Sequence, residues 1–119
     1  MTFKSELKYL GFVAAALQHE EIFYAIADPQ RRRLLDLLAG GEFAAQALAR
    51  RFDISFAAVS QHLKVLLEAG LVSRRAEGRR RIYRLAPDKL RVVDDWTGGY
   101  RKFWRSRLKR LGEYLDTHE

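Results

Sequence analysis

Apolar residues recur along this chain at spacings of three and four, the period of an amphipathic α-helix. Between residues 20 and 52 they fall into three stretches, which are separated by residues that start or end helices. Asp28-Pro29 offers an N-cap followed by a proline at the first helical position, and Gly40-Gly41 is a C-terminal stop. The pattern predicts helices over Glu20–Ala27, from Asp28-Pro29 to Gly40-Gly41 and over Ala44–Arg51, with inward-facing Ile22, Phe23, Ile26, Leu34, Leu35, Leu38, Leu48 and Phe52.

A fourth helix is predicted over residues 55–69. Ser55 is placed to cap it after the short break Asp53-Ile54-Ser55, and Gly70 ends it. One face of this helix is apolar and is formed by Val59, Leu63, Leu66 and Leu67. The opposite face is short or polar and is formed by Ala57, Ser60, Gln61, Lys64 and Glu68. Because such a face suits base edges and phosphates in a major groove, the segment is predicted to be a recognition helix.

The residues after Gly70 follow the pattern of a strand, a turn and a second strand. Leu71-Val72 and Ile82-Tyr83 flank the segment AEGRRR, which puts arginines at the tip of a hairpin. This hairpin predicts a basic wing over residues 76–82. Together the elements predict a winged helix-turn-helix: a mainly α fold with a small β-hairpin (α+β), in one domain whose core spans residues 20–86.

Both ends of the chain carry further amphipathic stripes. The first lies in an expected N-terminal helix over residues 1–19 and includes Leu7 and Leu10. The second lies in an expected long helix within residues 87–119, starting near Asp88, and includes Val93, Trp96, Tyr100, Trp104, Leu108, Leu111 and Leu115. Two such stripes predict a homodimer interface, although both helices could instead fold back on the same protomer. Gly98-Gly99 interrupts the second helix and predicts a kink, a close approach of two backbones or a hinge.

Composition narrows the function classes. The chain has 119 residues and 22 Lys and Arg against 15 Asp and Glu, a formal charge of +7 that favours a polyanionic partner. The sequence contains no cysteine, which excludes disulfides, thiolate metal sites and cysteine nucleophiles. The segment LGFVAAAL resembles the apolar part of an export signal, but its helical spacing and the nearby Glu6 favour an amphipathic helix. No run approaches the roughly 18 apolar residues of a membrane span, so a cytoplasmic protein is predicted.

The central segments resemble those of the ArsR/SmtB family of bacterial repressors. The resemblance rests on IADPQRRRLLDLL, VSQHLKVLLEAGLV and EGRRRIYRL in this order, and WTGGYRKFWRSRLKRLGEYL resembles a subgroup without the cysteine metal site. It implies a homodimer of winged-helix protomers that represses a promoter, often including its own. It also implies that Ser60, Gln61 and His62 face DNA and that Gly78 to Arg81 form the wing.

Two positions depart from the family pattern. Phe56 and Ala57 stand where relatives often carry a polar residue followed by proline. Phe56 could pack on a thymine methyl group, or it could tuck against the turn that precedes its helix. Ala44 stands where a Ser or Thr cap is common, which should cost roughly 1 kcal/mol of local helix stability.

The sequence predicts neither a metal site nor an enzyme. The three histidines, His19, His62 and His118, are far apart, and the C-terminal Asp116-Thr117-His118-Glu119 offers ligand types without a rigid frame. Asp94-Asp95 is an adjacent acidic pair, and neighbouring helical residues do not converge on one face. We therefore predict no catalytic residue, no cofactor and no metal, while an unknown effector remains open.

The predicted partner is double-stranded promoter DNA, bound as an inverted repeat with recognition helices about 34 Å apart. The run Arg31, Arg32 and Arg33 is predicted to be part solvated face and part DNA-backbone contact. An architectural DNA binder and a winged helix that binds another protein are the alternatives. The predicted DNA-contact residues are Ser55, Phe56, Ala57, Ser60, Gln61, His62, Lys64, Arg79, Arg80 and Arg81.

Overall fold

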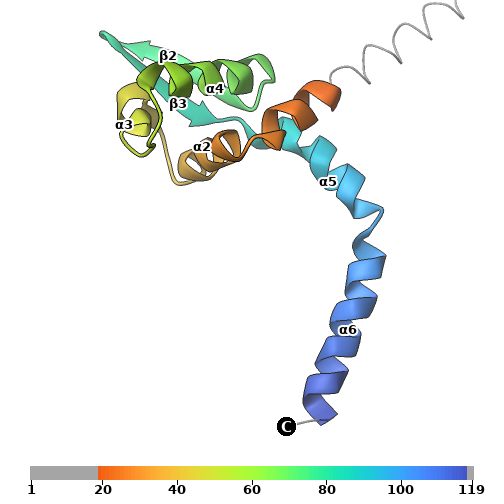
Figure 1. Cartoon of the computed structure of the whole chain (residues 1–119). Coiled ribbons are helices and arrows are strands. Elements are labelled where there is room, and N and C mark those ends of the chain that lie inside the picture. The colour runs from red at the N-terminus through yellow and green to blue at the C-terminus, as the bar shows by residue number, and fades with distance from the viewer. Residues whose placement is uncertain (1–18, 118–119) are drawn as a thin grey trace, which may run out of the picture.

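The computed structural model describes residues 19–117 and shows a winged head from which a C-terminal helix projects (Figure 1). The predicted N-terminal helix, with Leu7 and Leu10, lies outside the described residues apart from its last position. The described chain begins with a helix over residues 19–27. It continues with α2 (Pro29–Ala39), β1 (Phe43–Ala44), α3 (Ala45–Ala49), α4 (Phe56–Glu68), β2 (Val72–Glu77), β3 (Arg80–Leu85), a 3₁₀ turn (Pro87–Leu90), α5 (Arg91–Gly98) and α6 (Arg101–Thr117).

The helices of the head start where the sequence places their caps. The Asp28 carboxylate accepts hydrogen bonds from the backbone N–H groups of Gln30 at 2.8 Å and Arg31 at 3.2 Å, which caps α2. The Ser55 hydroxyl accepts from the N–H of Ala58 at 3.1 Å and caps α4. Ala44 gives α3 no side-chain cap, and α3 covers only Ala45–Ala49 instead of the predicted Ala44–Arg51. A five-residue helix without a cap depends on packing for its stability.

One apolar core joins these helices to the sheet. Its most deeply buried side chains come from α2, α3, α4 and the turn after α4, and they are Leu34, Leu48, Val59, Leu63, Leu66 and Leu71. Each such side chain contributes about 1.5–3 kcal/mol when it leaves water. The inward faces predicted for α2 and α4 are confirmed, and the outward face of α4 is left for other contacts.

The hairpin is longer than the sequence pattern indicated. Its strands run over Val72–Glu77 and Arg80–Leu85, and Leu71 lies just before the first strand as a buried core residue. The pairing is antiparallel, from Val72↔Leu85 at the base to Glu77↔Arg80 at the tip. Gly78 has φ 62° in the two-residue turn, a conformation that favours glycine. The wing is therefore a ribbon with a tight tip rather than two short strands around a loop.

A third strand, β1, was not predicted. It consists of Phe43 and Ala44, which pair with Tyr83 and Ile82 of β3, so the sheet order is β1-β3-β2. This pairing attaches the wing to the segment before α3. The wing is therefore joined to the helix-turn-helix at two places. One is the pairing of β1 with β3, and the other is the turn that leads from α4 into β2.

The C-terminal segment is two helices rather than one. A 3₁₀ turn over Pro87–Leu90 precedes α5, and the helix breaks after Gly98 before α6 begins at Arg101. Of the alternatives that the sequence left open for Gly98-Gly99, the break corresponds to a kink. A close backbone approach is not seen in the described chain, because an added Cβ at Gly98 would meet no atom within 4 Å.

The two C-terminal helices differ in how they contact the head. Trp96 of α5 stacks edge-to-face on Phe23 of the 19–27 helix, with ring centroids 5.5 Å apart, and Val93 packs against the core. Every residue of α6 is exposed, and the helix leads away from the head (Figure 1). The alternative that the second stripe folds back on its own protomer is therefore wrong for α6. Within residues 19–117 no helix combines the length and apolar character needed to cross a bilayer.

Candidate nucleic-acid interface

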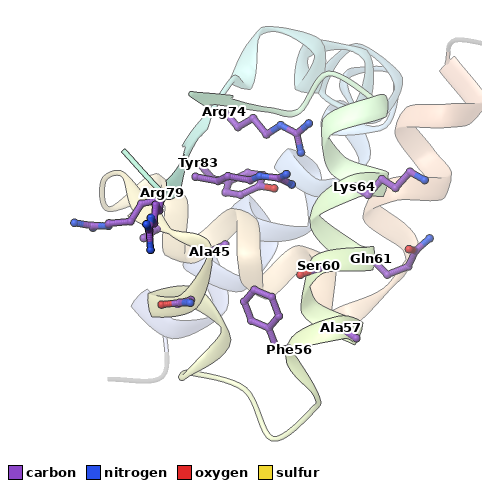
Figure 2. A pocket seen from close by; sticks show the side chains of 13 residues that line it. Ala45, Phe56, Ala57, Ser60, Gln61, Lys64, Arg74, Arg79 and Tyr83 are labelled. Atoms are coloured by element: carbon purple, nitrogen blue, oxygen red, sulfur yellow. The ribbon is translucent and has the colours of Figure 1, made fainter. Parts of the chain in front are cut away.

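An open cleft of about 670 Å³ lies between α4 and the wing (Figure 2). The residues around it come from β1, α3, α4, β2, the wing tip and β3. They are Ala44, Ala45, Gln46, Phe56, Ala57, Ser60, Gln61, Lys64, Arg74, Arg79, Arg80, Arg81 and Tyr83. Eight of the ten predicted DNA-contact residues thus border one cleft, which leaves Ser55 and His62 as the two that do not.

The outward face of α4 supplies the polar wall. Ser60, Gln61 and Lys64 follow one another along the helix and border the cleft. In Figure 2, Ser60 lies on the side of α4 toward Tyr83, and the side chains of Gln61 and Lys64 extend from the other side of the helix. A hydroxyl, an amide and an ammonium group offer both donors and acceptors, so this wall can meet base edges and phosphates. Ser55 contributes indirectly, because its cap holds the first turn of α4 in place.

The wing supplies the cationic wall. Arg75 is engaged within the protein: its guanidinium donates to Glu42 at 2.7 Å and to Glu77 at 3.3 Å. The hydrogen bond to Glu42 is the main reason why the pKa of Arg75 is raised. In the described residues, Arg74, Arg79, Arg80 and Arg81 form no ion pair. Their charges are available to an anion at the cleft.

Five residues of the cleft were missed in the sequence: Ala44, Ala45, Gln46, Arg74 and Tyr83. The register pairs Arg74 with Tyr83, and paired residues of an antiparallel ribbon share one face. Strand alternation would have placed Arg74 on the cleft if the hairpin had been read at its full length. Nothing in the sequence marks Ala44, Ala45 and Gln46 as cleft residues, because they reach the cleft only through the pairing of β1 with β3.

His62 lies on a different side of α4 from the cleft. The Arg31 guanidinium reaches its Nδ1 atom at 3.3 Å. Arginine has no acceptor, so Arg31 is the donor, and the neutral ring then carries its proton on Nε2. The Nε2–H group of His62 then has no hydrogen-bond partner among the described residues.

The arginine run at the start of α2 has a structural role that the sequence interpretation missed. Arg31 is only 8% exposed, and it donates to the carbonyls of Ala25 at 2.7 Å and Tyr24 at 2.9 Å. Arg32 donates to Ile26 and Ala27, at 2.9 Å and 3.1 Å. These are the last four carbonyls of the 19–27 helix, which have no partner within their own helix. For Arg31 the prediction of a solvated or DNA-facing side chain is wrong.

The third arginine of the run, Arg33, contacts the helix-turn-helix. It donates to the carbonyl of Arg51 at 2.7 Å and lies over the ring of Phe52, 4.7 Å from its centroid. The run therefore holds the 19–27 helix and the turn before α4 to α2. The sequence did contain an indication of this role. Three arginines stand a few residues after the end of a helix whose last carbonyl groups need hydrogen-bond donors.

Metal-binding chemistry finds little support in the described part of the chain. No group of three His, Asp or Glu side chains lies close enough there to hold an ion. Asp94 of the acidic pair is an ion-pair partner of Arg101. His118 and Glu119 lie outside the described residues.

Comparison with known proteins agrees with this geometry. A helix-turn-helix domain model matches residues 26–75. The chain is 38% identical over 98 residues to the HTH-type transcriptional regulator Rv2034 of Mycobacterium tuberculosis, a match that covers 82% of this chain and 89% of the relative. It is 39% identical over 75 residues to the transcriptional repressor SdpR of Bacillus subtilis, covering 63% and 83%.

Solved structures share the fold. The structure of the homodimeric winged helix-turn-helix DNA-binding domain of Mb0332 from Mycobacterium bovis, described as a possible ArsR-family regulator, superposes with a TM-score of 0.61. It is 34% identical and covers 70% of this chain and 83% of that chain. The winged helix-turn-helix architecture predicted from the sequence is confirmed.

Proposed function

Because the chain belongs to the ArsR family of helix-turn-helix transcriptional regulators, we propose that it is a homodimeric repressor of a bacterial promoter. Each protomer reads one half of an inverted-repeat operator through residues 55–69 and the wing at residues 76–82. SdpR, one of its relatives, is a transcriptional repressor, and the Mb0332 domain is a homodimer that binds DNA. The chain acts in the cytoplasm, where bacterial promoters are.

The observation that carries this proposal is the cleft beside α4. It combines one hydrogen-bonding wall, formed by Ser60, Gln61 and Lys64, with one wall of unpaired arginines. Duplex DNA offers both partners in the matching arrangement, since base edges line its groove and phosphates border it. A site for a small neutral metabolite would not need so many free cations.

The proposed roles divide between the two walls. Gln61 has an amide that can pair with adenine in the major groove, with Ser60 and Lys64 adding base and phosphate contacts. Arg79 and Arg80, with Arg81 beside them, reach the flanking minor groove, where narrow A/T-rich segments attract arginine. His62 adds its Nε2–H as a donor to a phosphate from the neighbouring side of α4.

The second half of the proposal is dimerisation through the terminal helices. Five large side chains at spacings of four, four, three and four form one exposed apolar stripe on and just before α6: Tyr100, Trp104, Leu108, Leu111 and Leu115. Leu108 is 67% exposed, so the stripe finds no cover within the described protomer. A second copy of the chain would cover it. Val93 and Trp96 of α5, together with Leu7 and Leu10 of the N-terminal segment, complete the proposed interface.

Charge on α6 favours an antiparallel pair. Six cations stand in its first ten residues, whereas Glu113 and Asp116 stand near its end. This order opposes the helix dipole, which prefers acidic residues at the start and basic residues at the end. When two copies of α6 run in opposite directions, the basic half of one helix lies beside the acidic end of its partner. In this proposal the chain is divided into a head over residues 20–86 and a dimerisation segment over residues 87–119.

The proposal is tested by selecting duplex DNA from a random pool with the purified full-length protein. The expected product is an inverted repeat whose half-sites are about 10 base pairs apart, centre to centre. A variant with both Gln61→Ala and Lys64→Ala should enrich no motif, whereas the control Ser106→Ala, on the polar side of α6, should enrich the same motif as the wild type. Failure of the wild-type protein to enrich any sequence would contradict the proposed function and favour an architectural role or a protein partner.

A further inference from the structure

The first residue of α4 is an exposed aromatic side chain. Phe56 is 51% exposed and does not belong to the core cluster. Its ring lines the cleft instead of burying itself against the turn before α4 (Figure 2). Half of a large apolar side chain thus remains in water, which costs free energy unless a partner covers it.

Small apolar residues also border the cleft. Ala57 follows Phe56 on α4, and Ala44 and Ala45 border the cleft from β1 and α3, next to the amide of Gln46. One turn further along α4 the lining becomes polar at Ser60, and the arginines lie on the side of the wing. Along α4 the lining of the cleft therefore changes from the ring of Phe56 to the hydroxyl of Ser60, four residues apart on one helical face.

A recognition helix meets base edges with its N-terminal residues. The edges that DNA presents in the major groove consist of hydrogen-bond donors and acceptors, with one exception among the four standard bases. Thymine carries a 5-methyl group, which is bound through apolar contact with side chains such as Ala and Phe. The ring of Phe56, at the first position of α4, offers this kind of contact.

We propose that the exposed ring of Phe56 forms a subsite that receives the 5-methyl group of one thymine in each operator half-site. The inference rests on the proposed function, since it requires the recognition helix to lie in a major groove. Phe56 then selects T at the position beside the base pair that Ser60 contacts. A pyrimidine without the methyl group leaves the ring of Phe56 partly uncovered.

The test replaces single thymines of the selected operator with deoxyuridine, which removes the methyl group and keeps the hydrogen-bond pattern. Affinity is measured for the wild-type protein by fluorescence anisotropy, one position at a time. At one position in each half-site the substitution should weaken binding roughly fourfold, the effect of one buried methyl group. Substitution in both half-sites should weaken binding by about fifteenfold.

Variants assign this effect to Phe56. In Phe56→Ala the methyl-less and normal operators should bind alike, and in Phe56→Leu part of the difference should remain. Gln61→Ala, the matched control, should bind more weakly while keeping the full response to deoxyuridine. Because Phe56 lies outside the core, the variants should unfold at the wild-type denaturant concentration, which circular dichroism checks.

The outcomes separate this inference from the proposed function. If the wild-type protein binds its operator tightly and no thymine position responds, the subsite is wrong and the repressor proposal stands. The subsite is equally wrong if Phe56→Ala keeps the deoxyuridine effect, if it weakens binding to all DNA equally, or if the half-sites contain no thymine. If no operator can be selected at all, both proposals fail.

Discussion

Arg31 and Arg32 donate to the last four carbonyls of the 19–27 helix, and Arg31 also reaches His62 on α4. A guanidinium can serve three acceptors at once because its donors form a fixed planar fork. Arg31 therefore connects the 19–27 helix to the flank of α4. This arginine holds the scaffold together, whereas the arginines that border the cleft are the ones proposed to contact the partner.

Replacing Arg31 by lysine tests this role. A lysine ammonium keeps the charge but cannot reach the Ala25 carbonyl, the Tyr24 carbonyl and His62 together, so buried acceptors lose their donors. We expect Arg31→Lys to lower the free energy of unfolding by about 2–3 kcal/mol in urea denaturation. Arg32→Lys, at an exposed position, should cost less than about 1 kcal/mol. Equal losses in the two variants would contradict the scaffold role of Arg31.

Asp28 makes stability depend on pH at the acid end. Partial desolvation would raise its pKa, but hydrogen bonds from the backbone N–H groups of Arg31 and Gln30, helped by the nearby positive charge of Arg31, lower it overall. A carboxyl group whose pKa is lower in the folded state stabilises the fold above its unfolded pKa. That contribution is lost as the pH falls through the folded pKa.

The corresponding variant is Asp28→Ala. It should lower the free energy of unfolding by about 1 kcal/mol near pH 7, the usual worth of an N-cap. Urea titrations at pH 7 and near pH 3 should show the difference between wild type and variant shrinking in acid. A difference that stays constant between the two pH values would mean that the charged cap contributes nothing.

Gln61 and Arg79 should differ in what they contribute to DNA binding. Both residues border the cleft; the amide of Gln61 is proposed to contact base edges, and Arg79 at the wing tip is proposed to contact phosphates and to respond to groove shape. Gln61→Ala should weaken binding to the operator by about 1–3 kcal/mol and leave scrambled DNA almost unaffected. Arg79→Ala should weaken both and reduce the salt slope by about one. Equal losses on both DNAs for both variants would refute this division.

Among the elements, α6 stands apart because every one of its residues is exposed in the described protomer. Most of the stability of a helix in a protein comes from the packing of its amphipathic face, so we expect α6 to need a partner. Its two sides differ in chemistry: Trp104, Leu108 and Leu111 lie along one, and Lys102, Ser106 and Lys109 along the other. The apolar side is the one expected to meet the second copy.

Leu108→Glu tests that assignment. Burying a carboxylate in an apolar interface is expensive, so the variant should be monomeric at concentrations where the wild type is a dimer. Analytical ultracentrifugation over a series of loading concentrations measures the shift, and operator affinity should fall with it. The control Ser106→Glu adds the same charge on the opposite side and should remain dimeric. A dimeric Leu108→Glu protein would remove α6 from the interface.

The sequence predicted those elements whose pattern is local. The helix around Leu34 and Leu38 and the one around Leu63 and Leu66 have caps, apolar periods and stops, so their existence followed from short-range chemistry. β1 could not be found, because a two-residue strand has no period and forms only against Tyr83 and Ile82. The spacing of three and four between apolar residues continues across Gly98-Gly99, so only the glycines themselves indicated the break.

The residues of the candidate site were also predicted only where they belong to a local sequence pattern. Gln61 and the wing arginines were found because they lie on surfaces that the helical period and the hairpin pattern define. The burial of Arg31 could not be predicted, because in the sequence it is identical to its neighbours Arg32 and Arg33. Only the tertiary position of the 19–27 helix end distinguishes the three residues.

At the scale of the whole molecule, the heads and the C-terminal helices have separate tasks. In the proposed complex, each head would place one cleft and one wing on DNA, and the formal charge of +7 would steer that encounter. In the proposed dimer, the projecting α6 would set the distance between the two heads. Specificity therefore requires both tasks, since one head reads too few base pairs to select a site.

Fluorescence anisotropy over a salt series tests this account most directly, with the full-length protein on its selected operator and on a scrambled duplex of the same composition. The account predicts that near physiological salt the operator binds at least about a thousandfold more tightly. It also predicts that scrambled DNA shows only salt-dependent binding. Equal affinities with the same salt slope on both duplexes would contradict it, because the cleft would then be reading phosphates alone.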